Sequence, residues 1–544
     1  MGPNMRIDKI NIENFRCFRG KFTLKLNEGV NVLVGDNEAG KSTILEAVNL
    51  GLSGVLNGKY LKNQLSPYLF NHQVATEYIE SLKTANKQSP PHILIEIFFA
   101  DEFPLFEGNG NSERQKASGI RFKIEFDPDY ESEYQTLVAS GDVLSIPVEY
   151  YRISWQSFAR ESVTGRSIPL KSVLIDSTSN RYQNGSDVYI SRIIRDDLDD
   201  KEKVGLSQAH RRLKEAFGSD KAVVAINKKV NDKANVSNKK LHVSVDLSSH
   251  NSWETSLMAY LDETPFQQIG KGEQCIVKTN LALGHQKAQE ANIVLLEEPE
   301  NHLSHSKLNE LMDAVSKSCT KKQAIISTHS SFVANKLGLD HLILLKNPKV
   351  TRLTDLSSDT YNFFKKLPGY QTLRLLLCKK AVLVEGDSDE LIFQKAYMKE
   401  NDGRLPIHDG IDVISVKLTF KRFLEIAEKL GQPVAVITDN DGDYANKITK
   451  KYSAYENVDC VSIFADERDV LNTLEPQFID ANSADLKGLC DVIEISPEDY
   501  TTVDEIREYM LSNKTSWALR VFESEETVKY PDYIQQAVRW CNDE

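Results

Sequence analysis

The feature that most constrains this chain is an apolar run followed by a glycine-rich loop in residues 30–43, V-N-V-L-V-G-D-N-E-A-G-K-S-T. The β-branched run predicts a buried strand, and the spacing G-x-x-x-x-G-K-S is that of a phosphate-binding loop. The glycines let backbone N–H groups reach phosphate oxygens, the lysine meets the outer phosphates, and the serine hydroxyl serves Mg²⁺. A helix is predicted from Ser42 to about Leu52. The nucleotide contacts predicted in the loop are Gly35, Asn37, Gly40, Lys41, Ser42 and Thr43.

Length and composition predict a globular protein of several units. With 544 residues the chain is too long for one ordinary domain, so we expect two to four units and favour two. No apolar run reaches the ~20 residues that span a bilayer, and no charged-then-apolar leader opens the chain. We therefore expect a soluble, cytoplasmic protein that does not contact a membrane. The seven cysteines include no C-x-x-C pair, so neither a zinc knuckle nor a disulfide framework is indicated.

The formal charge of −13 argues against indiscriminate binding to polyanions, which needs clustered Lys and Arg. It leaves room for a local basic groove, although a single basic pair is more often a solvated surface. The candidate contributors are Arg211-Arg212, Lys228-Lys229, Lys239-Lys240, Lys379-Lys380 and Lys447 with Lys450-Lys451.

The opening of the chain predicts two strands ahead of the loop. Residues 7–18 alternate apolar and polar side chains and then bend at Asn14-Phe15-Arg16, and residues 22–26 alternate likewise. This segment of about forty residues resembles the start of the ATPase heads of chromosome-maintenance and RecF-like proteins.

Residues 55–260 carry weaker signals. Strand-like runs occur at 92–99, 120–126, 148–154, 223–226 and 241–247, and a helical stretch is predicted over about 188–217. No long heptad array interrupts the region, so it is not a coiled-coil arm. We expect a compact insertion whose helical stretch is a candidate dimerisation element.

Three further segments follow in a fixed order. Residues 268–274 precede a helix-like run at 276–283, residues 293–300 form an apolar strand that ends in paired acids, and residues 324–331 form another that ends on a histidine. In this order after the loop, they resemble the signature, Walker B and switch segments of ABC-type ATPases, which implies such a domain over residues 5–370. His302 and His305 could be taken for metal ligands, but a structural or interface role is favoured for them.

The resemblance to ABC-type ATPases implies roles for individual residues. Glu297 would hold Mg²⁺ through water, Glu298 would polarise the attacking water, and His329 would be the switch histidine. Gly270 and Gly272 would bind ATP from the signature loop of a second subunit. Lys271 stands where the family usually has Ser, and Glu273 where the longer signature has Gly, which leaves γ-phosphate sensing and turnover open.

A second set of acids follows two later strands. Residues 379–390 form a basic pair, a buried strand and an acid-glycine turn that opens a helix, and residues 433–443 form a strand that ends in Asp-x-Asp. Parallel strands of a doubly wound sheet bring such acids to one edge. Their oxygens select Mg²⁺ or Mn²⁺. Because Glu385 and Asp389 are four residues apart, we expect both on one helix face.

The paired segments resemble the TOPRIM fold, here over residues 375–544. The fold class predicted for the chain is therefore α/β, an ABC-type ATPase domain followed by a TOPRIM doubly wound domain. This layout, with L-E-E-P-E-N-H-L, I-S-T-H-S, L-V-E-G-D-S-D and D-N-D-G-D, resembles the OLD (overcoming lysogenization defect) nucleases. The metal ligands implied by that resemblance are Glu385, Asp389, Asp439, Asp441 and Glu475, with Ser42 and Glu297 in the ATPase domain.

The OLD resemblance also implies a catalytic lysine near the C-terminus, and Lys514 fits its place ahead of a helix. The implied reaction is two-metal hydrolysis of a DNA phosphodiester, regulated by ATP, in antiphage defence. The expected partners are DNA, a second or further copies of the chain, and a separate defence protein such as a helicase-like protein or a retron reverse transcriptase with its nucleic acid.

Two other functions stay open at this point. The first alternative is a non-cleaving, ATP-gated DNA clamp or repair loader, which would not need five assembled acids. A topoisomerase or primase is a weaker alternative, because the chain lacks length for a strand-passage gate and cysteines for a primase zinc ribbon.

Overall fold

The computed structural model describes residues 5–36, 38–141, 143–176, 182–183, 186–187, 198–233, 259–284, 290–319, 321–346, 349–366, 374–375 and 378–543. Asn37, the first part of the predicted helix at 188–217 and the predicted strand at 241–247 lie outside these residues. The chain divides into two compact units, Met1–Asn31 with Ser42–Thr328 and Val32–Lys41 with His329–Glu544.

The first sheet is antiparallel, with the order β2-β1-β6-β8-β7 and β9 paired to β8. Its strands are β1 (Ile7–Glu13), β2 (Lys21–Lys25), β6 (Ile93–Phe99), β7 (Glu107–Gly108), β8 (Ala117–Phe126) and β9 (Tyr151–Ser157), and α2 (His72–Leu82) and α3 (Glu131–Ser140) belong to the same region. The strands predicted at 22–26, 92–99 and 120–126 are confirmed, and the strand predicted at 7–18 is confirmed over Ile7–Glu13. The predicted bend after β1 is also confirmed, because Asn14 and Arg16 have positive φ angles of 55° and 51°.

The second sheet has the order β10-β15-β16-β3-β17-β18. Its strands are β3 (Val30–Gly35), β10 (Ser172–Asp176), β15 (Ile293–Glu297), β16 (Gln323–Thr328), β17 (Leu342–Lys346) and β18 (Lys349–Arg352). The accompanying helices are α1 (Lys41–Ser53), α7 (Lys271–Gly284), α9 (His305–Ser318), α10 (Ser331–Leu337) and α11 (Ser358–Lys366). Strands β10, β15 and β16 run parallel to one another, as do β3 and β17. The predicted apolar runs are almost wholly buried.

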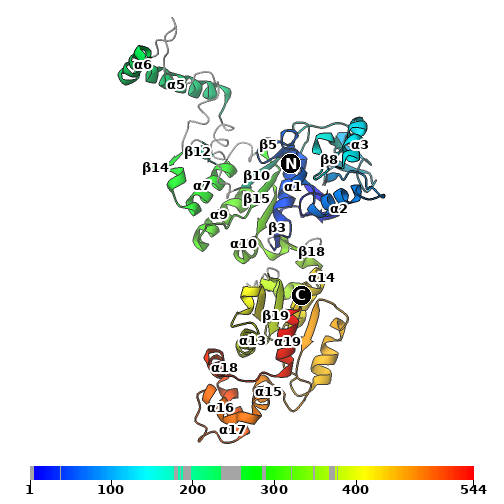
Figure 1. The fold of residues 1–544 in the computed structure, drawn as a ribbon, viewed down its shortest axis with the longest axis vertical. Coiled ribbons are helices and arrows are strands. Elements are labelled where there is room, and N and C mark those ends of the chain that lie inside the picture. The colour runs from blue at the N-terminus through cyan, green and yellow to red at the C-terminus, as the bar shows by residue number, and fades with distance from the viewer. Residues whose placement is uncertain are drawn as a thin grey trace. The chain divides into compact units, whose positions relative to one another are not determined.

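The C-terminal sheet is parallel throughout, with the order β20-β19-β21-β22. Its strands are β19 (Lys380–Val384), β20 (Ile411–Ser415), β21 (Val434–Ile437) and β22 (Val461–Phe464). The helices around it are α13 (Asp387–Glu400), α14 (Phe420–Leu430), α15 (Leu474–Ala481), α16 (Leu486–Val492), α17 (Val503–Ser512), α18 (Lys514–Glu523) and α19 (Asp532–Asn542). In Figure 1, α13 and α19 lie beside β19, and a single apolar core joins these elements to α15 and α18.

Within the second unit, the segment that follows β17 packs on α14. Phe364 meets Phe423 edge to face, with ring centroids 5.3 Å apart. The Arg422 guanidinium lies 4.7 Å from the centre of the Phe363 ring, and the Ser357 hydroxyl donates to Glu425 at 2.8 Å. Apolar and polar contacts thus tie residues 357–364 to the helix that covers the C-terminal sheet.

Two predictions in the insertion need correction. The residues at 223–226, predicted as a strand, lie in helix α6 (Lys221–Lys233), and the described part of the predicted 188–217 helix begins at α5 (Asp200–Ser219). Asp199 and Glu202 form a capping box that starts α5, and the polar residues around 223–226 give α6 a helical rather than an alternating period. None of the helices in the described residues is long and apolar enough to cross a membrane.

Candidate metal centre and nucleotide loop

In the nucleotide loop, the lysine side chain is hydrogen-bonded to the backbone of the loop itself. Lys41 is 3% exposed, and its Nζ donates to the carbonyls of Gly35 and Asp36, both at 2.8 Å. A Cβ at Gly35 would lie 2.3 Å from the Leu345 carbonyl, so this position requires glycine. Gly40 has a φ of 89°, which also favours glycine. Helix α1 begins directly at Lys41, so Ser42 and Thr43 lie in its first turn. The loop thus has the backbone of a phosphate site.

The paired acids of the second sheet lie at the end of β15. Glu297 is the last residue of the strand and stands opposite Ser327 of β16. Glu298 has a φ of 39°, rare for a residue other than glycine, and its carboxylate accepts a 2.8 Å hydrogen bond from Asn301 Nδ2. Its N–H donates to the Ser327 carbonyl at 3.0 Å. Glu298 is therefore held in a fixed turn, with His329 one residue beyond β16.

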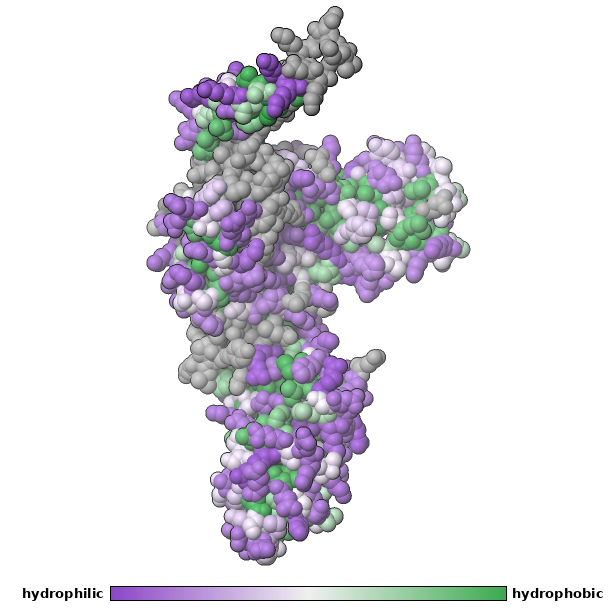
Figure 2. Space-filling model, turned by 60° about the vertical axis from the view of Figure 1, so that its left-hand side comes forward, coloured by the Kyte–Doolittle hydropathy of each residue, from purple (hydrophilic) through white to green (hydrophobic). Residues whose placement is uncertain are grey.

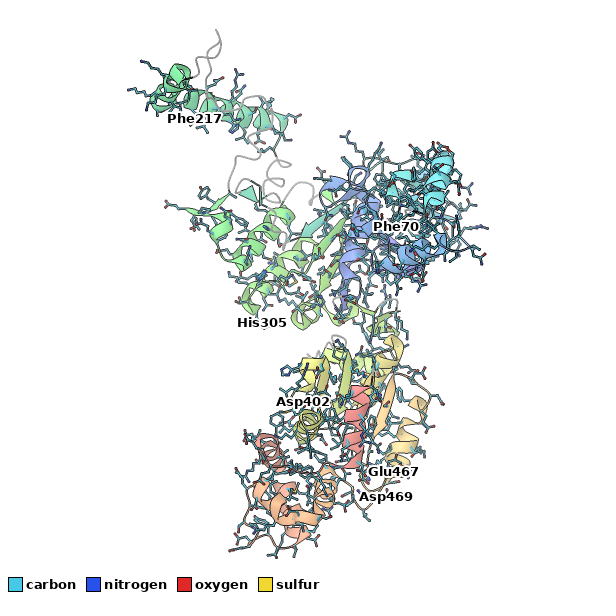
Figure 3. All side chains as sticks on the ribbon, in the orientation of Figure 1. Phe70, Phe217, His305, Asp402, Glu467 and Asp469 are labelled. Atoms are coloured by element: carbon cyan, nitrogen blue, oxygen red, sulfur yellow. The ribbon has the colours of Figure 1, made fainter. Side chains whose placement is uncertain are left out.

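The predicted signature loop is split between a turn and a helix. Gly270 is exposed and precedes α7, which begins at Lys271. A Cβ at Gly272 would lie 2.5 Å from the His302 carbonyl, so the helix start packs tightly on the loop after β15. His302 and His305 are exposed, and His305 opens α9 (Figure 3). The ATP contacts and the switch and signature roles of these residues stay predictions.

Glu385 and Asp389 do not share a helix face as predicted. Glu385 follows β19 directly, Gly386 is extended with φ −151°, and α13 begins only at Asp387. Asp389 instead lies in the first turn and accepts the Gly386 N–H at 3.0 Å. Glu385 therefore belongs to the strand-to-helix turn, whereas Asp389 belongs to the helix. The two acids remain close to each other. Burial is the largest cause that raises the pKa of Asp389, and the nearby Glu385 carboxylate raises it further.

The ends of β19 and β21 are joined through Glu385. Its Oε1 accepts hydrogen bonds from the Thr438 hydroxyl and from the Asp439 N–H, the latter at 3.1 Å. Asp439 Oδ1 is buried and makes no hydrogen bond. Burial first, and then Asp389, Glu385 and Glu475, raise the pKa of Asp439 to about 9. Burial and Glu385 raise that of Asp389 to about 7. Glu385 and Asp439, which follow the neighbouring strands β19 and β21, thus meet at one sheet edge.

Glu475 and Lys514 approach this edge from two helices. Glu475 is 3% exposed in the first turn of α15, and Lys514 is the first residue of α18. Lys514 Nζ lies 3.9 Å from Glu475 Oε1, which places an exposed cation at the rim. Asp441 has a φ of 50°, and its N–H donates to the Asn472 carbonyl at 3.1 Å. The five acids and the lysine thus belong to one neighbourhood, while their roles stay predictions.

The donor set fits a divalent cation in its chemistry. All five predicted ligands are carboxylates, which hard cations prefer, and Asp439 offers a buried oxygen without a donor. Among the described residues, however, no three His, Cys, Asp or Glu side chains are grouped closely enough to hold a metal. A cation held by three or more of these carboxylates would require them to move closer together.

The sequence analysis missed three residues that shape this edge. Thr438 bonds to Glu385, and buried Asn440 donates to the carbonyls of Asp466, Arg468 and Leu471. Lys447 pairs with Asp441 at 3.2 Å. Their positions beside and within T-D-N-D were a usable signal for Thr438 and Asn440. Lys447 was noted only as one of several basic residues.

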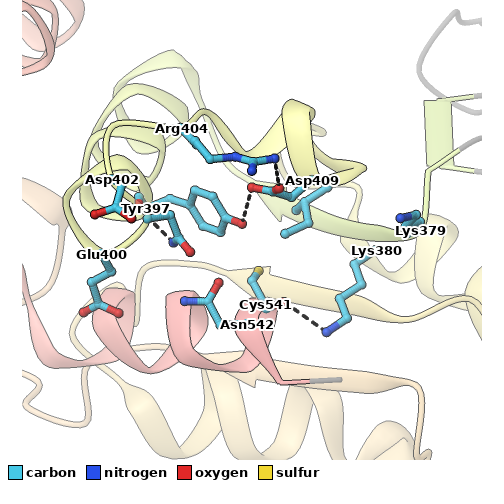
Figure 4. A pocket seen from close by; sticks show the side chains of 11 residues that line it. Lys379, Lys380, Tyr397, Glu400, Asp402, Arg404, Asp409, Cys541 and Asn542 are labelled. Carbon is cyan, nitrogen blue, oxygen red and sulfur yellow. Dashed lines mark hydrogen bonds and ion pairs between the residues drawn. The ribbon is translucent and has the colours of Figure 1, made fainter.

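A surface pocket lies at the opposite end of this sheet (Figure 4). It is lined by Lys380 at the start of β19 and Ile411 at the start of β20, with Tyr397 and Asp409 hydrogen-bonded beside it. None of the predicted site residues lines this pocket. It is therefore separate from the edge of the sheet at which the predicted acids lie, which is called the carboxylate edge below.

Two family models match the chain. One described as an AAA domain matches residues 9–325, and one described as an overcoming lysogenization defect protein-like TOPRIM domain matches residues 376–441. No curated protein matches.

Several solved structures are similar to parts of the chain. The SMC head domain from Thermotoga maritima is 13% identical, with a TM-score of 0.29, and the match covers 64% of this chain and 97% of that one. The C-terminal region of the Burkholderia pseudomallei OLD protein is 21% identical, with a TM-score of 0.24, covering 31% and 98%. The corresponding region of the Xanthomonas campestris pv. campestris OLD protein is 18% identical, with a TM-score of 0.24, covering 30% and 93%.

Proposed function

This chain belongs to the AAA domain family and also carries an OLD-like TOPRIM domain, and we propose that it is an ATP-regulated, divalent-metal-dependent DNA endonuclease. The ATPase domain extends over residues 5–370 and the TOPRIM nuclease domain over residues 375–544. The observation that carries the proposal is the electrostatic crowding of Asp389 and Asp439 beside Glu385 and Glu475. Several acids gathered at one strand edge disfavour the folded protein unless a cation joins them.

The proposed chemistry assigns each side chain a separate task. Glu385, Asp389, Asp439, Asp441 and Glu475 hold Mg²⁺ or Mn²⁺. Two such cations supply a water of lowered pKa and support for the leaving oxygen. Thr438 and the Asp439 N–H orient Glu385. Lys514, at the rim, neutralises charge that builds on the scissile phosphate.

The effect of ATP binding is transmitted to the nuclease site through contacts within the second unit. The loop residues 32–41 belong to the same unit as the TOPRIM domain. The Leu345 carbonyl packs on Gly35, and the next residue, Lys346, donates to Gln432. Gln432 in turn donates to the carbonyls of Cys378 and Lys379, at the start of β19. A change at the loop therefore has a contiguous route to β19, the strand that Glu385 follows.

The proposed assembly is a homodimer or larger oligomer that acts in the cytoplasm in antiphage defence, with DNA and a separate defence protein as partners. Helices α5 and α6 are the candidate dimerisation element. They carry exposed apolar residues, seen as green patches on the helical pair of Figure 2, namely Val204, Leu213, Phe217, Val224 and Ile226. Apolar residues exposed on paired helices are typical of a surface that is covered in an assembly.

The experiment that tests the proposal is cleavage of plasmid DNA with Mg²⁺ or Mn²⁺, with and without ATP. We expect cutting by the wild type, none by Glu385→Ala, and cutting that no longer responds to ATP in Lys41→Ala. ATP hydrolysis by Glu385→Ala should match the wild type, which shows that the variant folds. Absence of cutting by the wild type under every metal and nucleotide condition would contradict the proposal.

A non-cleaving, ATP-gated DNA clamp is the second candidate. It is favoured by the finding that no three potential ligands are grouped as a ready metal site in the described residues. A clamp would bind DNA in an ATP-dependent way and leave plasmids intact, and Glu385→Ala would not alter it.

A further inference from the structure

Two segments beside the carboxylate edge contain basic residues and no acid of their own. Residues 415–422, S-V-K-L-T-F-K-R, and residues 444–455, Y-A-N-K-I-T-K-K-Y-S-A-Y, each contain three basic residues and no acid. This composition stands out in a chain whose net charge is −13. Arg422 is engaged with the Asp359 carbonyl and the Phe363 ring. The other five, Lys417, Lys421, Lys447, Lys450 and Lys451, are called the lysine strip below.

The two segments lie side by side although they are remote in sequence. Lys451 Nζ lies 5.8 Å from the centre of the Phe420 ring, at the start of α14. It also lies 5.0 Å from the centre of the Tyr452 ring. The Tyr455 hydroxyl donates to the Lys421 carbonyl at 3.4 Å. Lys451 is half-buried on two aromatic rings, while the other four lysines of the strip are exposed. Contacts made by Lys451 and Tyr455 therefore hold the two segments against each other.

The lysine strip adjoins the acids directly. Lys447 pairs with Asp441, and it projects from the π-helical turn η10 (Ala445–Lys450), a kind of turn that is frequent at functional sites. The Ser415 hydroxyl donates to the Glu385 carbonyl at 3.3 Å, so the loop that bears Lys417 passes beside Glu385. Glu385 and Asp441 are both within electrostatic reach of Lys451. Lys514, at the start of α18, lies 3.9 Å from Glu475, a third acid of this edge.

We infer that the lysine strip binds the sugar–phosphate backbone of the DNA strand that enters the carboxylate site. The inference rests on the proposed function, because a phosphodiester can reach the acids only if its neighbouring phosphates are neutralised. Lysines on one side of the acids and Lys514 at their rim give the strand a path across the site. Several exposed lysines on two adjoining segments that contain no acid match a polyanion rather than an acidic peptide with its mixed side chains.

The test is DNA binding without cleavage. A fluorescein-labelled duplex is titrated with the full chain in EDTA, and anisotropy gives the affinity between about 50 and 200 mM salt. For Lys447→Gln/Lys450→Gln/Lys451→Gln we expect the slope of log affinity against log salt to become shallower by about 2 to 3, since each phosphate contact contributes ~0.9. A charge-matched control replaces three exposed lysines elsewhere, Lys429, Lys487 and Lys529, with Gln, and should keep the wild-type slope.

Half-buried Lys451 could cost stability, so a second variant avoids it. Lys417→Gln/Lys421→Gln alters only exposed residues, and we expect its slope to become shallower by about 2. Substitution of Lys447, Lys450 and Lys451 by Arg should preserve the slope because it keeps the charge. If both Gln variants melt like the wild type and bind with its slope, the inference is wrong.

The outcomes separate this inference from the proposed function. A wild type that binds DNA through the strip and cuts nothing leaves the strip in place and refutes the endonuclease. A wild type that cuts DNA while both strip variants bind it normally refutes the strip alone. A wild type that binds no DNA refutes both.

Discussion

The nucleotide loop and the carboxylate edge both lie where buried strands end, but their charged groups are stabilised to different degrees. The charge in the loop has hydrogen-bond partners, whereas the acids at the edge lie close to one another. In the loop, the buried Lys41 ammonium is satisfied by two carbonyls of the same loop. At the edge, burial and neighbouring acids raise the pKa of Asp389 and of Asp439, and one Asp439 oxygen has no donor. The loop is therefore stable without its ligand, whereas the edge is destabilised until a proton or a cation is bound.

The two regions also differ in how far apart their parts lie in sequence. The loop closes within residues 35–41, so its hydrogen bonds are local. The acids of the edge follow β19 and β21 and lie in α15, and their crowding is a product of tertiary structure. Local contacts preorganise one centre, and long-range packing assembles the other.

The largest effect that sharpens this comparison is expected for Asp439→Asn. Cleavage should fall about a thousandfold, because several kcal/mol of charge stabilisation would be lost with the metal. Without metal, the same variant should melt at a higher temperature than the wild type at pH 8, since Asp439 must take up a proton on folding at that pH and Asn needs none. Plasmid cleavage and thermal melting measure the two effects.

Asp443→Asn is the matched control for that variant. Asp443 belongs to the same loop, but its carboxylate accepts hydrogen bonds from Asn446, which lower its pKa. Its amide variant should cut normally and melt no higher than the wild type. A lower melting temperature for Asp439→Asn would break the contrast between the two centres.

The reverse sign is expected at the nucleotide loop. Lys41→Ala leaves the buried Gly35 carbonyl without its lysine donor, whereas the Asp36 carbonyl keeps the Ala39 N–H at 3.0 Å, so the free energy of unfolding should fall by about 2 kcal/mol. ATP affinity should fall by about a hundredfold, or about 2.7 kcal/mol, with the loss of the phosphate ammonium. Chemical denaturation and nucleotide titration measure these changes. Lys59→Ala, an exposed substitution on β5 (Lys59–Tyr60), should alter neither quantity.

A smaller, pH-dependent effect follows from the raised pKa values. The unfolded chain releases these two protons near pH 4, whereas the folded protein keeps them to about pH 7 at Asp389 and about pH 9 at Asp439. The folded state thus binds more protons in between, so these residues make stability fall as pH rises from about 4 to about 9. Divalent cations should oppose this fall.

Thermal melting with and without Mn²⁺ measures this linkage. The cation should raise the melting temperature by more degrees at pH 8 than at pH 6, because it competes with protons for the same oxygens. Asp439→Asn should remove most of the difference. An equal rise at both pH values in the wild type would show that the acids are not the sites of binding.

Much of the fold could be predicted because its signals are local. The strands at 7–13, 93–99 and 293–297 follow from residues within each run, and the order of motifs placed the loop, the paired acids and the histidine on strand ends. The strand predicted at 223–226 was wrong because four β-branched or apolar residues outweighed the polar flanks that make α6 a helix.

The carboxylate edge was predictable in its identity and less so in its geometry. Spacing alone suggested one helix face for Glu385 and Asp389, but the extended Gly386 leaves Glu385 in the turn. The hydrogen bond from Thr438 and the ion pair to Lys447 join residues that meet only in the folded sheet. No periodicity in the sequence encodes such contacts.

The smallest effect probes whether the two centres communicate. Lys346 lies one residue beyond the carbonyl that packs on Gly35, and its ammonium donates to Gln432, which is 1% exposed. Gln432 holds the carbonyls at the start of β19, the strand that leads to Glu385.

Lys346→Met removes the donor and retains the apolar stem. We expect the ratio of cleavage with ATP to cleavage without it to move toward one by about two- to fivefold, as coupling energies of this kind are modest. ATP hydrolysis and ATP-free cleavage should stay at wild-type levels, and Lys487→Met, on an exposed position of α16, should leave the ratio unchanged. If Lys346→Met keeps the full ATP response, the two centres share a unit without exchanging information through this contact, and the preorganised loop cannot set the state of the acid edge by this route.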